Sequence, residues 1–193
     1  MTVQNKTLRI GDRAPSFIAK TYRGEITSLK KFRGKMVWLI FYRYPTCPLC
    51  NLHLNALKLR IDKYKADGLE IIAVFETGSE KFEKKTLSFL DKMTVVTDPM
   101  KVLYRLYQTD VKLTSVFRPN VALTFIKAVL SGFPQGTVDG QLGQVPASFL
   151  IAENGNIEQM YFGRNIADHI PFSKVEEFIQ ARSLGIWKAG ARF

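Results

Sequence analysis

Blocks of apolar residues alternate with amphipathic stretches along this chain, and each block predicts a strand or a helix. Residues 36–42 are apolar without interruption, which is typical of a central strand covered on both faces. After them, apolar residues at 50, 54, 57, 61 and 64 recur at steps of four and three, which predicts one amphipathic helix over 48–66. Residues 69–75 form a second apolar run. The strand–helix–strand order predicts a right-handed parallel crossover.

The second half of the chain continues the alternation and ends in a hairpin. Asn154-Gly155 is a strong hairpin signal between two extended runs, so we expect those runs to pair antiparallel. The remaining predicted elements are a helix beginning at 78–79, a strand at 93–97, a helix capped by 98–99, strands at 144–151 and 156–162, and a last helix opened by a capping box at 173–176.

One stretch departs from the alternation. Residues 111–143 hold an apolar helical run at 121–130, followed by a loop with four glycines. We interpret this stretch as an insertion in a single domain that covers residues 1–193. It can be a packing element, or it can be a lid or a dimer contact, because long loops in compact domains are often functional.

The chain's only two cysteines, Cys47 and Cys50, stand where the first apolar strand turns into the helix. Pro48 suits the first helical turn, so Cys47 falls at the helix N-terminus, among unpaired N–H groups and the positive end of the dipole. Such a position can lower a thiol pKa from about 8.5 to roughly 3.5–7.5. Cys50, one turn further, faces the interior. We therefore interpret Cys47 as a nucleophile and Cys50 as its resolving thiol.

The cysteine pair has two other interpretations. A structural zinc site needs about four ligands, and the chain has no second cysteine pair. His53 and His169 are its only histidines, at a spacing that fits no common zinc pattern. The cysteines can also be buried by accident. The strand–Cys-x-x-Cys–helix context favours the redox interpretation, so we expect no metal and no cofactor.

Composition adds a strong positive charge. The 28 Lys and Arg residues outnumber the 17 Asp and Glu residues, for a net charge of +11. The basic residues are spread along the chain without a recognised nucleic-acid motif, so we expect no specific nucleic acid and no membrane partner. The N-terminus lacks the apolar segment of a signal peptide, and two closely spaced cysteines favour a reducing, cytoplasmic setting.

Pro146 stands immediately before a predicted strand. It can be an ordinary edge residue. Near a redox cysteine pair it can instead follow a cis peptide bond at Val145-Pro146, which would expose the Val145 backbone to a substrate strand.

These pieces together resemble the thioredoxin fold, and more narrowly the alkyl hydroperoxide reductase/thiol-specific antioxidant (AhpC/TSA, peroxiredoxin-like) family. The resemblance lies in residues 11–17, in residues 29–35 with the strand that follows them, and in residues 144–162. It implies an α/β thioredoxin-like fold with a central mixed β-sheet flanked by helices and a helical insertion before the last β-hairpin. It also places Cys47 at the family's peroxidatic position.

The chain departs from the family at two positions. Tyr44 stands where the family has a threonine that helps to bind peroxide, and Thr46 is next to the cysteine instead. Pro146 stands where the family has an arginine, which is the thioredoxin-like choice. Arg43 can supply a positive charge, or it can be a solvated strand end. We take Thr46, Val145 and Pro146 as candidate substrate-binding residues.

The resemblance and the cysteine pair together predict a thiol oxidoreductase. The first expectation is reduction of hydroperoxides through a Cys47–Cys50 disulfide that an external thiol reductant, such as a thioredoxin-type donor, reduces. The second is a thioredoxin-like protein disulfide oxidoreductase. The third is a non-catalytic thioredoxin-fold binding module or redox sensor. A homodimer is a further expectation.

Overall fold

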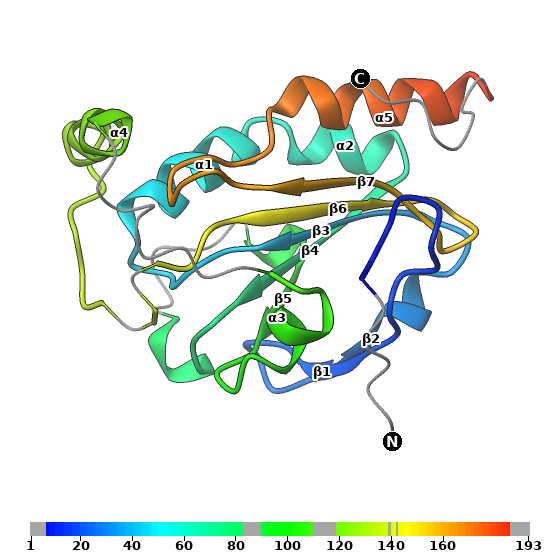
Figure 1. The fold of residues 1–193 in the computed structure, drawn as a ribbon, viewed down its shortest axis with the longest axis horizontal. Helices are drawn as coiled ribbons and strands as arrows, with labels where there is room; N and C mark the ends of the chain where they lie inside the picture. The colour runs from blue at the N-terminus through cyan, green and yellow to red at the C-terminus, as the bar shows by residue number, and fades with distance from the viewer. Residues whose placement is uncertain (1–6, 83–89, 110–118, 139, 142, 186–193) are drawn as a thin grey trace.

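A five-stranded mixed sheet organises the chain, with β3 at its centre (Figure 1). The computed structural model describes residues 7–82, 90–109, 119–138, 140–141 and 143–185. The strand order is β5-β4-β3-β6-β7; β3 is parallel to β4 and antiparallel to β6, and β7 is antiparallel to β6. The strands are β3 (Met36–Phe41), β4 (Leu69–Phe75), β5 (Thr94–Thr97), β6 (Ala147–Ile151) and β7 (Ile157–Phe162). The predicted central strand and parallel crossover are confirmed.

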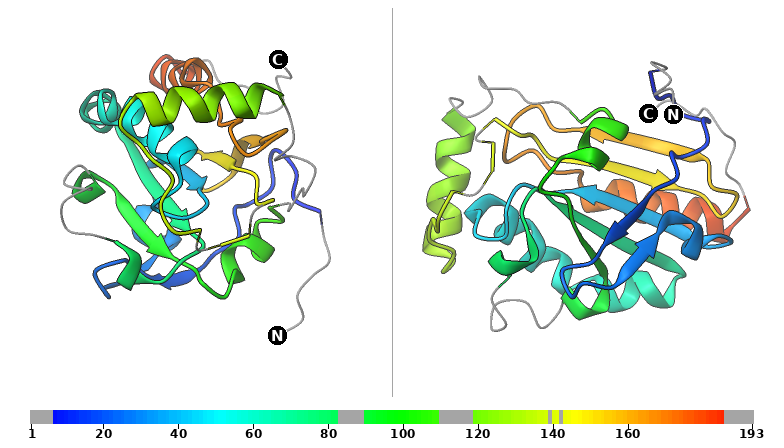
Figure 2. Two further views of the ribbon diagram at one scale, coloured as in Figure 1. Left: turned by 90° about the vertical axis from the view of Figure 1, so that its left-hand side faces the viewer. Right: turned by 90° about the horizontal axis from the view of Figure 1, so that it is seen from below.

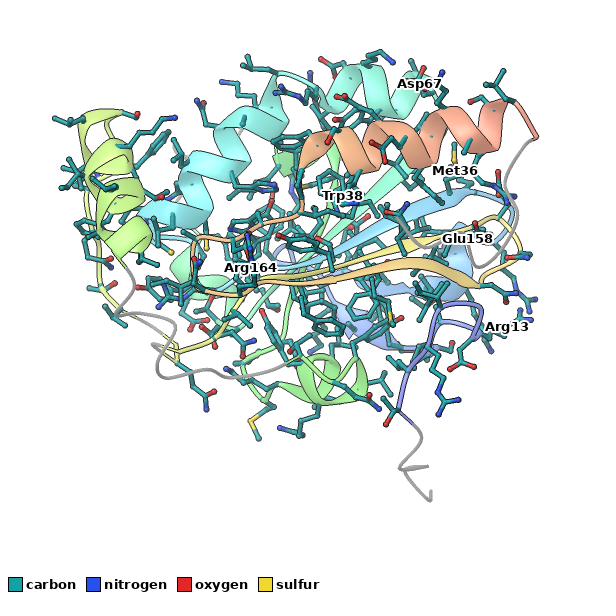
Figure 3. The ribbon with its side chains drawn as sticks, turned by 45° about the horizontal axis from the view of Figure 1, so that its top comes forward. Arg13, Met36, Trp38, Asp67, Glu158 and Arg164 are labelled. Atoms are coloured by element: carbon teal, nitrogen blue, oxygen red, sulfur yellow. The ribbon has the colours of Figure 1, made fainter. Side chains whose placement is uncertain are left out.

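Each face of the sheet is covered by its own apolar layer, and β3 contributes alternate residues to both. Met36, Trp38 and Ile40 pack toward the helices, and Figure 3 shows Trp38 between the sheet and the helical layer. Val37 and Leu39 pack on the opposite face. The first layer contains α1 (Pro48–Lys58), α2 (Ile61–Ala66) and α5 (Phe172–Ser183), and the second contains α3 (Val102–Leu106) and the hairpin of β1 (Ile18–Lys20) and β2 (Ile26–Ser28).

The helix predicted over residues 48–66 is two helices, so the single-helix prediction was wrong. A turn at Leu59 and Arg60 separates them, and Arg60 has φ −116° and ψ −19°. The Arg60 guanidinium donates to the Ala56 carbonyl at 2.9 Å and lies 4.5 Å from the centre of the Phe172 ring. The predicted apolar face is confirmed, because all five of its residues are at most 2% exposed. The break therefore changes the helix without changing what it buries.

The two predicted helix caps have different outcomes. Asp98 accepts hydrogen bonds from the Val102 and Leu103 amides at 2.9 and 2.7 Å, which confirms the first cap. The capping box at 173–176 was wrong: α5 begins at Phe172 with no side-chain cap, and Glu176 accepts from the Tyr64 hydroxyl instead. Most of the helix predicted after residue 78 falls on 83–89, outside the described residues; short 3-10 helices at Ser79–Lys81 and Leu90–Lys92 flank that gap.

The predicted insertion places α4 (Pro119–Leu130) at the end of the sheet where β3 leads into α1 (Figures 1 and 2). Val121 and Ala128 are buried against the body of the protein, whereas Leu123 and Leu130 are exposed. The first part of the insertion, 111–118, lies outside the described residues. In the part of the chain that the structure describes, no helix is long and apolar enough to cross a membrane. The boundaries of the domain and of its insertion stay a prediction.

Candidate active site

Cys47 stands between the end of β3 and the first turn of α1. It is the N-cap residue of α1, with φ −72° and ψ 119°, and its carbonyl accepts the Asn51 amide at 2.9 Å. The Asn51 side chain donates to the Pro45 carbonyl at 2.9 Å and so ties the approach loop to the helix. Pro48 follows at the first helical position, where the absence of an N–H leaves no bond unmade. The sequence predicted this position of the thiol.

The environment of the Cys47 thiol favours the thiolate. Its side chain is fully buried, and burial alone would raise its pKa. A hydrogen bond from Cys50, the guanidinium of Arg43 and the backbone N–H groups of Cys50 and Leu49 oppose burial and lower the pKa of Cys47 to about 6. At pH 7 a thiol with this pKa is about nine-tenths ionised.

Arg43 is the cation of the site. Its Nη1 lies 3.5 Å from the Cys47 sulfur, and its guanidinium carbon lies 4.9 Å from the centre of the Tyr44 ring. The side chain is only 3% exposed, so the solvated-strand-end interpretation was wrong. Arg43 comes from the loop after β3, whereas the resemblance placed the family's arginine where this chain has Pro146.

Cys50 lies one turn deeper and has the opposite character. It is fully buried, and burial, the hydrogen bond to Cys47 and the nearby Cys47 charge all raise its pKa well above the usual value for a thiol. Both cysteines are free thiols. The pair therefore combines one sulfur that ionises near neutral pH with one that stays protonated, and the two are already in hydrogen-bond contact.

A buried ion pair between Glu76 and Lys101 lies next to Arg43. Glu76, whose side chain is inaccessible to solvent, pairs with Lys101, and its amide donates to the Arg43 carbonyl at 3.0 Å. Lys101 adopts a left-handed conformation at φ 53° and also donates to the Gln144 side chain at 3.0 Å. The sequence analysis missed this pair. Its only signal was an acidic residue directly after the apolar run of β4.

Thr46 faces the insertion. Its hydroxyl donates to the Thr137 carbonyl at 2.7 Å, and its own carbonyl accepts the Gly136 amide at 3.4 Å. Gly136 is required there, because a Cβ at that position would lie 2.6 Å from the Thr46 Cβ. The loop after α4 is thus fitted against the residue that precedes Cys47.

Val145 and Pro146 lie beside the site through the register of the sheet. Phe41 is opposite Ala147 in the β3–β6 pair, which brings residues 145–146 alongside the loop that follows β3. Val145 is fully buried, and its carbonyl accepts the Gln144 side-chain amide at 3.2 Å. A substrate-binding role for Thr46, Val145 and Pro146 stays a prediction.

Of the two interpretations of Pro146, the one with a cis peptide bond at Val145-Pro146 was wrong, because no cis bond occurs among the described residues. The Pro146 carbonyl accepts the Gly163 amide at 2.8 Å, which extends the β6–β7 pairing back to the proline. An extended trans backbone therefore leads directly into β6, and the carbonyl of Val145 is already occupied by Gln144.

Cys47 is among the residues that line an open cavity of about 420 Å³, although its own exposed fraction is 0%. Arg43, Tyr44 and Cys47 line one side, and the inward face of α4 lines the other. None of the three predicted substrate-binding residues lines it. The residues contributed by the insertion are Val121, Ala122, Phe125, Ile126, Gln135 and Val138.

The two histidines stack on each other behind the site. Their ring centres are 4.2 Å apart at an interplanar angle of 11°, and the Tyr42 hydroxyl lies 2.8 Å from His53 Nδ1. Burial and the charge of Arg43 lower the pKa of His169 to about 3, so its ring is neutral at pH 7. Across the described ranges, no cluster of three or more His, Cys, Asp or Glu side chains could hold a metal ion.

A thiol at the N-cap of a helix, on a sheet with β3 at its centre, defines a thioredoxin-fold thiol protein. The chain belongs to the AhpC/TSA family, whose model matches residues 10–160. This confirms the family and the fold that the sequence predicted.

Individual relatives agree with this assignment. The chain is 38% identical over 81 residues to the thioredoxin-like protein YneN of Bacillus subtilis, and the matched segment covers 42% of this chain and 46% of YneN. It is 28% identical over 168 residues to the putative peroxiredoxin bcp of Haemophilus influenzae, and the matched segment covers 84% of this chain and 91% of that protein. Its fold is similar to that of a Plasmodium vivax 2-Cys peroxiredoxin in the reduced state, with a TM-score of 0.63, 18% identity, and 91% and 82% of the two chains covered. These relatives fit the predicted class of enzyme, a thiol oxidoreductase.

Proposed function

We propose that this chain is a thiol peroxidase in which Cys47 reduces a hydroperoxide and Cys50 resolves the product. The observation that carries the proposal is the asymmetry of the pair: Cys47 has a lowered pKa, lies 3.5 Å from a buried guanidinium and lines an open cavity, whereas Cys50 is protonated behind it. A nucleophile needs ionisation and access, and a resolving thiol needs only contact with the nucleophile.

The first step consumes the peroxide. The Cys47 thiolate attacks the distal oxygen of the O–O bond, an S–O bond forms, and the O–O bond breaks. The leaving oxygen departs as an alcohol or as water after it takes up a proton. Cys47 is oxidised by two electrons to a sulfenic acid. Arg43 stabilises the thiolate before the attack and the negative charge that develops on the leaving oxygen during it.

The second step stores the oxidation as a disulfide. Cys50 loses its proton and attacks the Cys47 sulfur, an S–S bond forms, and the S–O bond breaks to release water. An external dithiol, of the thioredoxin type, then reduces the disulfide and becomes oxidised itself. A reducing compartment such as the cytoplasm would supply that dithiol.

Titration of the reduced protein with hydrogen peroxide tests the proposal. We expect two thiols to be lost for each peroxide consumed, with one intramolecular disulfide in the product. In Cys50→Ser the loss falls to one, and a sulfenic acid that reacts with dimedone accumulates. In Cys47→Ser no thiol is lost at stoichiometric peroxide. Loss of the one remaining thiol, Cys50, in Cys47→Ser as readily as thiols are lost in the unmodified protein would contradict the assignment of the nucleophile.

A protein disulfide oxidoreductase is the second candidate, because Cys-x-x-Cys spacing and a proline before β6 are thioredoxin-like. Against it, the insertion loop occupies the backbone of Thr46, beside the reactive thiol, where an extended protein substrate would need room. An insulin-reduction assay run beside the peroxide titration separates the two. Absence of both activities would favour a binding module or redox sensor. The homodimer stays a prediction.

A further inference from the structure

We propose that the chain carries a second ligand site, at the end of the sheet away from Cys47, which binds small molecules with two or more linked phosphoryl groups. The site is a cavity of about 90 Å³ with a basic rim and an apolar floor. It lies beside Val37 and Ile151, which are paired near the start of β3, whereas Cys47 follows the end of that strand. The inference does not depend on the proposed peroxidase function.

The rim has an excess of positive charge. Among the described residues, four basic side chains and one acidic side chain line the cavity. The acidic one is Glu153, which already pairs with Arg182 on α5, and the basic Lys35 pairs with the Glu70 carboxylate at 2.6 Å. The other three basic residues are exposed and form no ion pair with any residue that the structure describes: Arg13, Lys30 and Arg33. The rim therefore holds three positive charges that nothing in the described part of the chain neutralises.

The turn between β6 and β7 holds these cations together. Its Gly155 carbonyl accepts the Ala14 amide at 2.9 Å, and its Glu153 carbonyl accepts the Gly34 amide at 3.1 Å. The turn thus ties together the two segments that carry the three unpaired cations. Figure 1 shows this turn at the end of the sheet away from α4, and Figure 3 shows Arg13 at the same end. Because the backbone of the site is already ordered, an anion can bind there without first ordering a loop.

The unpaired cations match a short phosphate chain. Two of the three are arginines, whose planar donors bind phosphate oxygens in pairs. A phosphoryl group carries about −1.5 to −2 at pH 7, so two of them balance about three positive charges. The cations surround one cavity and do not follow a stripe along the surface, which fits a small molecule better than a nucleic-acid backbone.

The floor of the cavity can take an uncharged part of the ligand. It contains apolar side chains that are at most 6% exposed: Ala14, Val37, Ile151 and Ala152. A cavity of about 90 Å³ has room for roughly three groups of the volume of a water molecule. A ligand therefore enters it with one end only, and its remaining phosphoryl groups stay at the basic rim.

Calorimetric titration of the reduced full chain with pyrophosphate and with ADP tests the proposal. The buffer contains about 0.15 M NaCl, which screens charges far from the cavity, and no divalent cations. We expect one ligand to bind each chain with a Kd below about 1 mM, and orthophosphate to bind at least about tenfold more weakly. Tighter binding of ADP than of pyrophosphate would assign the apolar floor to a nucleoside, and equal binding would assign the site to the phosphate chain alone.

Charge variants show whether binding occurs at this cavity. Arg13→Gln/Arg33→Gln should weaken pyrophosphate binding at least about tenfold, because charged hydrogen-bond donors are lost. Lys20→Gln/Lys58→Gln removes the same charge from exposed positions that do not line the cavity, and it should change the Kd by less than about twofold. Ser16→Glu keeps every cation but adds a carboxylate to the lining; it should weaken binding at least about tenfold as well, and it covers the case in which the double arginine variant does not fold. The proposal is overturned if neither probe binds saturably, if the control loses as much affinity as the cavity variants, or if orthophosphate binds as tightly as pyrophosphate.

Discussion

Replacement of Arg43 by glutamine should raise the pKa of Cys47, because the guanidinium is the nearest full positive charge to its sulfur. At 3.5 Å and an effective dielectric constant of about 20, two unit charges attract by about 5 kcal/mol. That energy would correspond to a pKa change of about 3.5, and opposite charges at such distances change a pKa by about 1 to 3 in practice. Burial raises the pKa of Cys47, and without the Arg43 charge one of the contributions that oppose burial is gone. We therefore expect the pKa of Cys47 to rise from about 6 to between about 7 and 9.

The assay is the rate of Cys47 alkylation by iodoacetamide as a function of pH, in a Cys50→Ser background so that one thiol reacts. Arg43→Lys keeps the charge and should recover part of the effect, although a lysine cannot reproduce the planar contact with Tyr44. Arg23→Gln, at an exposed position that does not line the cavity, controls for a loss of net charge. A pKa in Arg43→Gln that stays within about 0.3 of the value in the same background, with an intact fold by circular dichroism, would refute the electrostatic argument.

Three further predictions concern the surroundings of the site. Lys101→Met leaves the buried Glu76 carboxylate without its cation and should lower the free energy of unfolding, measured in urea, by about 3 kcal/mol or more. Lys92→Met breaks an exposed ion pair and should lower it by less than about 1 kcal/mol. Equal losses in the two variants would contradict the reasoning. His169→Phe keeps the ring stack and removes a group that is neutral when folded but binds a proton below about pH 6.5 when unfolded. Since the folded pKa is about 3, the unmodified protein should lose up to about 2 kcal/mol more than the variant between pH 6.5 and pH 5, and parallel pH curves in urea would contradict this. Gly136→Ala forces a Cβ into the backbone-bonded loop beside Cys47 and should speed alkylation of that thiol at fixed pH; an unchanged rate would mean that the loop does not restrict access.

The sequence was most informative where one physical requirement acted over many residues. The apolar run at 36–42 had to be a strand covered on both faces, and all of these residues are at most 6% exposed. The helix face that begins at Cys50 was equally informative, because apolar residues at helical spacing lie on one side of the helix, and that side packs against the core. Both features fixed where the cysteine pair would lie. The resemblance to a known family agreed with them.

The features that the sequence did not predict depend on contacts between distant parts of the chain. Arg43 lines a cavity together with residues of the insertion, and the loop of that insertion, about ninety residues later in the chain, bonds to Tyr44 and Thr46. The pairing of Glu76 with Lys101 depends on how the segment after β5 returns to the site. No local pattern around either residue carries that information. The hydrogen bond between the Pro146 carbonyl and the Gly163 amide is likewise a long-range contact, which follows from the pairing of β6 with β7.

Burial does not explain why the pKa values of the two cysteines differ, because both residues are fully buried and burial raises both pKa values. The difference comes from the first turn of α1 and from Arg43, which favour the charge on Cys47, and that charge in turn opposes a second charge on Cys50. In the proposed cycle, a peroxide would convert the Cys47 thiolate to a neutral sulfenic acid, and the charge that raises the pKa of Cys50 would disappear while Arg43 remains. Cys50 would then be easier to deprotonate when its attack on Cys47 is needed. The first turn of α1 and Arg43, which lower the pKa of Cys47, would thus also favour the proposed resolving step.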